Sequence, residues 1–130
     1  MIGQNQYSQN REYDEKEVTI RSDEYKTVRE TQRKILKACL AEGILARMAG
    51  RNVTHVRDML LSFENEFSIR LSPGTIYPVV YSLEKRGNIQ RLAVGSKNVY
   101  IITARGRDYL QSLQQNSSLF HLMLSKILKA

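Results

Sequence analysis

Apolar residues repeat at helical spacing in two stretches of the first half of the chain. From about Val28 onwards, Ile35, Leu36, Cys39 and Leu40 recur every three or four residues, which predicts a helix. Gly43 is expected to end it, and residues 44–52 could be a short helix or a loop. A second helix is predicted over residues 53–67, with Asn52 or Thr54 as its cap. Its apolar stripe consists of Val56, Met59, Leu60, Phe63 and Phe67.

A third helix is predicted from Ser72 to Lys85. Ser72 can cap it, and Pro73 stands at the first helical position, where a missing N–H costs nothing. Gly87 can take the left-handed conformation that ends many helices. Its inward face is expected to consist of Ile76, Val79, Val80 and Leu83.

The pattern then changes to that of a β-hairpin. Residues 89–94 and 98–102 read as two short strands around a tight turn, Gly95-Ser96-Lys97. Thr103 opens a further helix, Asn116-Ser117-Ser118 interrupts it, and residues 119–130 form an amphipathic end. Three helices followed by a hairpin are typical of the winged helix-turn-helix, in which the second helix of the pair enters the major groove.

We therefore expect a mainly α fold with a small β-hairpin (α+β), a winged helix-turn-helix with an extra C-terminal helix. Residues 1–27 are predicted to be a mobile polar and acidic arm, because they are rich in Gln, Asn, Glu and Asp. Residues 28–115 are the predicted DNA-binding domain, and residues 116–130 the predicted dimerisation helix.

Charge adds a possible partner to this picture. The 130-residue chain has a net charge of +7; residues 1–27 contribute −2 and residues 28–130 contribute +9. A basic folded part is suited to an anionic polymer such as DNA, although solubility alone is the alternative explanation. The chain begins with polar residues, so we expect no signal peptide. It has no apolar run long enough for a membrane span, and we expect a cytoplasmic protein.

Three motifs resemble the PadR family of transcriptional regulators. The segment LSPGTIYPVVYSL, residues 71–83, is similar to the Ser-Pro-Gly-Thr-Leu-Tyr-Pro stretch that begins the family's recognition helix, with Ile76 in the Leu place. Residues 83–89 resemble its Leu-Glu-x-x-Gly-x-Ile passage, and residues 100–106 the end of its wing. The turn at Gly95 is shorter than the family's usual wing, and its His-Gly-Tyr-Glu-Leu passage has no clear counterpart at residues 54–57. The resemblance implies a homodimeric regulator, most simply a repressor.

The predicted DNA contacts begin at the N-terminus of the third helix. Free N–H groups and the positive end of the helix dipole attract phosphate, and Gly74 permits close approach of the backbone. The helix has no Arg or Lys before Lys85, so hydroxyl contacts and DNA shape are expected to matter more than bidentate guanine contacts. Basic residues of the wing and the following helix would bind flanking phosphates. The predicted contact residues are Ser72, Gly74, Thr75, Tyr77, Tyr81, Lys85, Arg91, Lys97 and Arg105, with Arg51, Arg57, Arg70 and Arg107 as weaker candidates.

The C-terminal segment is too apolar to remain in water alone. It either packs on its own domain or meets a second copy, and the resemblance favours a homodimer. A membrane-surface helix is the third option, for which Lys126 and Lys129 provide only a thin basic face. The predicted dimer contacts are Leu119, Phe120, Met123, Leu124 and Ile127.

Other chemistry finds little support in the sequence. Cys39, the single cysteine, is expected to be a buried structural thiol, and the isolated His55 and His121 do not form a metal site. We predict no catalytic residues and no cofactor; a small-molecule effector between dimer helices stays open. The alternative function is a winged-helix module that binds proteins within a larger assembly and does not read DNA.

Overall fold

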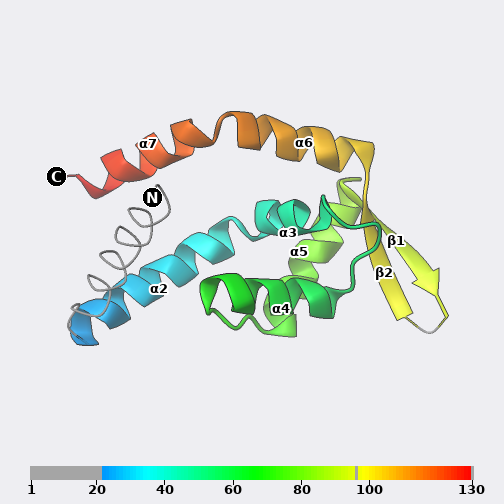
Figure 1. Ribbon diagram of the computed structural model, residues 1–130, viewed down its shortest axis with the longest axis horizontal. Coiled ribbons are helices and arrows are strands. Elements are labelled where there is room, and N and C mark those ends of the chain that lie inside the picture. The colour runs from blue at the N-terminus through cyan, green and yellow to red at the C-terminus, as the bar shows by residue number, and fades with distance from the viewer. Residues whose placement is uncertain (1–21, 96, 130) are drawn as a thin grey trace, which may run out of the picture. The chain divides into compact units, whose positions relative to one another are not determined.

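A computed structural model describes residues 22–95 and 97–129 of the chain (Figure 1). It contains two compact units, one ending at Ala38 and the other comprising Cys39–Ala130. The described part of the first unit is helix α2, Ser22–Ala38, which has no buried residue. Most of the predicted mobile arm lies outside the described residues, and residues 22–27 form the start of α2.

The helix predicted through residues 35–40 is in fact two helices. Helix α2 ends at Ala38 and α3, Leu40–Met48, begins after a turn at Cys39. The predicted stop at Gly43 is wrong, since Gly43 lies inside α3, close to the ring of Phe63. The prediction of a buried thiol is also wrong: Cys39 is exposed because the chain turns at this position.

The second unit is a mainly helical fold with a small hairpin, as predicted. Its remaining elements are α4 (Val56–Phe67), α5 (Pro73–Lys85), β1 (Ile89–Val94), β2 (Lys97–Ile102), α6 (Ala104–Gln115) and α7 (Ser117–Leu128). Helices α3, α4 and α5 enclose a core whose fully buried side chains include Ile44, Leu45, Met59, Phe63, Ile76 and Val80. Each of these helices turns one apolar stripe inward, which is why the i, i+3, i+4 pattern located α4 and α5, whereas for residues 44–48 of α3 the pattern is consistent with either a short helix or a loop.

The start of α4 differs in detail from the prediction. His55 is the residue before the first turn, and its backbone N–H donates to the Asp58 carboxylate at 3.4 Å. Thr54, one of the two predicted caps, instead exchanges two backbone hydrogen bonds with Tyr100, at 2.9 and 2.8 Å. This bridge joins the segment before α4 to strand β2. The hairpin is therefore connected to α4 through this bridge, as well as to α5 and α6 along the chain.

The end of α5 is a tightly hydrogen-bonded junction. The N–H of Gly87, with φ of 79°, donates to the carbonyl of Glu84, and the N–H of Asn88 to that of Leu83. This is the pair of bonds that closes a helix through a left-handed glycine, as predicted. The hydroxyl of Thr103 donates to the Gly87 carbonyl at 2.6 Å and accepts from the Gly106 N–H at 3.1 Å. One side chain thus connects the end of α5 to the start of α6.

The two strands form an antiparallel hairpin that projects beyond the helices (Figure 1). Arg91 stands opposite Tyr100, and Val94 opposite Lys97. Lys97 therefore belongs to β2 and not to the turn, while Ser96 lies outside the described residues. Gly95 has φ of 63°, the left-handed conformation that a tight hairpin turn requires.

Candidate nucleic-acid interface

The N-terminus of α5 is organised by Ser72. Its hydroxyl accepts a hydrogen bond from the Thr75 N–H at 3.2 Å and lies 3.0 Å from the Thr75 hydroxyl. The Ile76 N–H is bonded to the Ser72 carbonyl, and Pro73 has no N–H. Within the described part of the chain, this leaves the amide of exposed Gly74 as the free donor of the first turn. The helix end can therefore present one backbone N–H and its dipole to a phosphate.

Two tyrosines form the exposed face of α5 beyond this turn. Tyr77 and Tyr81 are 39% and 55% exposed, and their ring centroids lie 6.0 Å apart. The opposite face of the helix holds the buried Ile76, Val80 and Leu83. The phenols are thus on the solvent side of a helix whose orientation is fixed by its core contacts. They can donate to base edges or phosphate oxygens.

The wing meets this tyrosine face through Arg91. A shallow depression is lined by Tyr81, Glu84, Lys85 and Arg91. The Arg91 guanidinium lies 3.8 Å from the Glu84 carboxylate, and the two side chains are 50% and 33% exposed. The sequence did not predict this ion pair. It places the Arg91 guanidinium beside α5 and lowers the net positive charge of this part of the surface. Tyr81, Glu84 and Lys85 follow Tyr77 by four, seven and eight residues, so they lie on the same side of the helix. This spacing was the only sign in the sequence that the Glu84 carboxylate shares that side.

Tyr100 is the strand partner of Arg91, one of the residues that line this depression. It is 2% exposed, and burial raises the pKa of its phenol, with the negative charge of Glu84 as the next cause. Because Tyr100 stands opposite Arg91 in the hairpin, both side chains are on the sheet face toward α5. The hairpin face that carries Arg91 and Tyr100 is thus the one next to Glu84 of α5.

Lys97 is not brought together with Arg91. Successive side chains of a strand point to opposite faces, and Lys97, paired with Val94, belongs to the face opposite to that of Arg91 and Tyr100. Lys97 and Val94 are both exposed next to the turn. The two basic residues of the wing can therefore contact different strands of a duplex.

The other predicted basic contacts are dispersed. The Arg105 guanidinium lies next to Gly87, at the end of α5 remote from Ser72. Arg107 donates to the Ala49 carbonyl at 2.9 Å, where it caps the end of α3, and Arg70 pairs with Glu64 at 3.0 Å. Arg57 is exposed on α4. Of these residues, Arg107 has a clear structural task.

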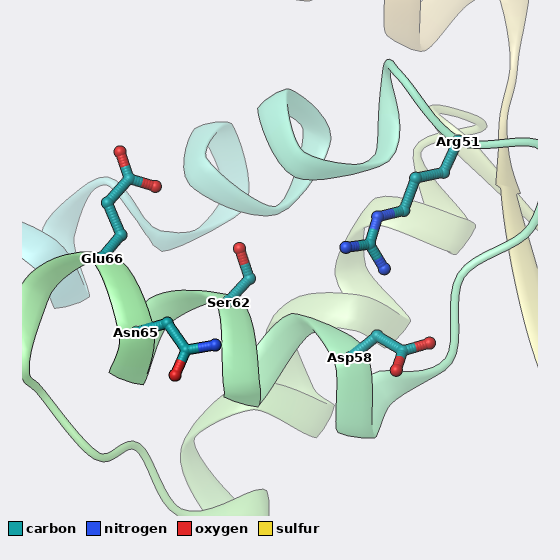
Figure 2. Close-up of a pocket in the computed structure, with 5 residues that line it drawn as sticks. All are labelled: Arg51, Asp58, Ser62, Asn65 and Glu66. Atoms are coloured by element: carbon teal, nitrogen blue, oxygen red, sulfur yellow. The ribbon is translucent and has the colours of Figure 1, made fainter.

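Figure 2 shows a second depression, where Arg51, from the segment that follows α3, lies above Asp58 and Ser62 of α4. Asn65 and Glu66 complete its polar lining. Glu66 pairs with Arg47 at 2.5 Å, and the Arg47 guanidinium also lies 4.5 Å from the ring centre of Phe63. The periodicity of α3 did not single out Arg47, because its role depends on a contact with α4.

Helix α7 presents the strongest apolar surface of the second unit. It has no buried residue, and Met123 and Ile127 are 62% and 64% exposed. A shallow apolar hollow runs along it, lined by Leu119, Leu122, Met123, Lys126 and Ile127. Among the described residues, no side chain of α7 is buried, so contacts within the chain do not cover this apolar surface.

No group of acidic, histidine or cysteine side chains suited to a metal ion occurs among the described residues. None of the helices in the described part of the chain is long and apolar enough to cross a membrane. Three core helices, an exposed helix N-terminus and a wing define a winged helix-turn-helix protein of the DNA-binding class.

The family follows from the sequence profile. Residues 44–112, just over half of the chain, match the Transcriptional regulator PadR-like family, and the chain belongs to it. Members are DNA-binding regulators and not enzymes. The match includes α4, α5, the hairpin and most of α3 and α6, and leaves out α2 and α7. Comparison with curated protein sequences found no match.

Solved structures share the fold at low sequence identity. A transcriptional regulator from Clostridium thermocellum is 17% identical, with a TM-score of 0.66 over 74% of this chain and 99% of its own. A PadR family transcriptional regulator from Eggerthella lenta is 20% identical, with a TM-score of 0.63 over 82% and 96%. The winged-helix DNA-binding protein F93 from STIV is 19% identical, with a TM-score of 0.52 over 57% and 82%. These similarities support the winged-helix assignment.

Proposed function

We propose that this regulator is a sequence-specific, homodimeric repressor that inserts α5 into the major groove of its operator. The observation that carries the proposal is the exposed surface of α5, where the free Gly74 amide precedes the paired rings of Tyr77 and Tyr81. A donor at the helix N-terminus binds a phosphate, and hydroxyls further along the helix reach base edges. Arg91 and Lys97 would bind the backbone on either side of this contact.

The apolar helix α7 supports the homodimer. Fully burying a large apolar side chain contributes about 1.5–3 kcal/mol, and α7 exposes several of them. The proposed contact face consists of Leu119, Phe120, Met123, Leu124 and Ile127. A two-fold dimer would place its recognition helices about 34–36 Å apart, in successive major grooves. Such a dimer acts in the cytoplasm, where its operator is, and excludes RNA polymerase from the base pairs that it covers.

Binding-site selection from a pool of random duplexes tests sequence specificity. We expect an inverted repeat with half-sites about one helical turn apart. Sedimentation velocity of the full chain tests the dimer: Ile127→Glu should give monomers, while Gln114→Glu, a matched change on α6, should not. Recovery of no common sequence would contradict operator reading, and a monomeric unaltered chain would contradict the dimer. Transcription in vitro from the selected site should fall when the protein is added.

The wing and the recognition helix are tested separately. Lys97→Ala should weaken binding to all duplexes alike and lower the salt dependence, because it removes one phosphate contact. Lys129→Ala, just after α7, is the matched control and should change neither. Tyr77→Phe removes one hydroxyl and should reduce affinity for the selected operator more than for random DNA. Unchanged operator affinity would remove this hydroxyl from the reading of bases.

A further inference from the structure

Helix α2 has a basic stripe along one side, outside the segment that matches the family. Lys26, Arg29, Arg33 and Lys37 follow each other at intervals of three, four and four residues, so they lie on one helix face. Lys26, Arg33 and Lys37 are exposed, and Arg29, which donates to Gln32 at 2.8 Å, is partly exposed. At about 1.5 Å per residue the stripe is roughly 16 Å long.

The apolar residues of α2 occupy a different side. Tyr25, Val28, Ile35 and Leu36 fall around a direction that is about a third of a turn from the centre of the basic stripe. Helix packing through the apolar side would therefore leave the basic stripe in solvent. Asp23 and Glu24 are confined to the first turn. Glu30, four residues after Lys26 and three before Arg33, lies on the side of the stripe and lowers its net charge from +4 to +3.

We propose that the basic stripe of α2 binds phosphates of the DNA duplex to which the second unit binds. The inference rests on the proposed DNA binding and adds a second contact surface to it. A duplex carries about one negative charge per 1.7 Å of its axis, so a stripe of about 16 Å faces several phosphates. Charge complementarity is thus high on a helix that has no buried side chain among the described residues.

The second unit gives a reason for an additional phosphate contact. Helix α5 has no basic residue before Lys85, and Arg91 is paired with Glu84. Arg107 and Arg47 are bound to carbonyl and carboxylate oxygens of the protein itself. Part of the positive charge of the second unit is therefore already compensated or used in the fold.

An anionic membrane is the other polyanion that a basic helix can meet. Helices that lie in a bilayer surface commonly carry Trp or Phe on a broad apolar face. Helix α2 contains neither residue, and Gln32 interrupts its apolar side. The described surface therefore favours DNA.

The test compares two double variants of the full chain that lose the same charge. Arg33→Gln with Lys37→Gln alters the stripe, and Lys34→Gln with Lys129→Gln removes two exposed charges that lie outside the stripe. Gln is nearly as favourable in a helix as Lys or Arg, so circular dichroism should show unchanged helix content. Fluorescence anisotropy with a random-sequence duplex, over a series of salt concentrations, gives the slope of log affinity against log salt. The stripe variant should lower the magnitude of this slope by about 1.8 for each bound protomer, or about 0.9 per lost phosphate contact, and the control should not.

Equal slopes for the two variants would overturn the inference while leaving DNA binding by the second unit intact. No binding of the unaltered chain to any duplex would overturn both proposals. Binding is also measured to vesicles of phosphatidylserine and phosphatidylcholine. If the stripe variant lost vesicle binding and kept the full DNA slope, the stripe would be a membrane contact and the inference would be wrong.

Discussion

The contact between α6 and the start of the hairpin leaves no room for a side chain at position 106. A Cβ added to Gly106 would lie 2.1 Å from the Asn88 carbonyl oxygen and 2.9 Å from Cγ1 of Ile102. The first of these atoms belongs to the backbone, so relief requires α6 to move away from β1. Gly106→Ala is therefore a sensitive probe of how the wing is attached.

The cost follows from two opposing effects. Overpacking a tight site costs about 1–3 kcal/mol and occasionally more, and a clash with backbone belongs at the upper end. Ala gains about 1 kcal/mol over Gly in a helix, which offsets part of this. We expect a net loss of about 2 kcal/mol, equivalent to a Tm lower by about 8–16 °C for a domain of this size.

Differential scanning calorimetry of the full chain measures the effect. Gly50→Ala is the matched control, since nothing lies within 4 Å of its added Cβ and its φ is not positive. The control should change stability by no more than about 0.5 kcal/mol. An equal Tm for both variants would refute the reasoning, because α6 could then not be seated against Asn88.

Two further predictions concern α5 and the buried phenol. Gly74→Ala meets only the Ser72 hydroxyl, at 3.8 Å, so it should raise stability by about 0.5–1 kcal/mol in urea unfolding and yet weaken DNA binding, since the new methyl group keeps phosphate from the backbone. Unchanged affinity would show that no phosphate approaches the Gly74 amide. Because the pKa of Tyr100 is raised above 10.0 in the fold, the unfolded chain releases this proton first, and stability should decrease as pH rises above about 10. Tyr100→Phe should reduce this decrease in urea unfolding between about pH 8 and 11, and an unaltered decrease would assign it to other groups.

The elements with local signals could be predicted from the sequence. Ser72 and Pro73 mark the start of α5, and Gly87 its end, through bonds within a few residues. Thr103 likewise caps α6. The turn at Cys39 has no such local signal: the apolar spacing continues through it, and the helix predicted there is interrupted in the structure.

The sequence named the candidate DNA-contacting residues of α5 and the wing, but it did not predict which of them lie next to one another. The spacing of Tyr77 and Tyr81 placed both rings on one face. That Glu84 faces Arg91 depends on the register of the hairpin, and so does the separation of Arg91 and Lys97 onto opposite faces. Such contacts between elements distant in sequence are set by packing, which periodicity does not describe.

The most direct test of the DNA-binding account is an anisotropy titration of the full, unaltered chain with a random-sequence duplex from low to physiological salt. We predict binding at low salt and a linear decrease of log affinity with log salt, because phosphate contacts release condensed cations. Absence of binding at low salt would contradict the account and turn attention to protein partners of α7.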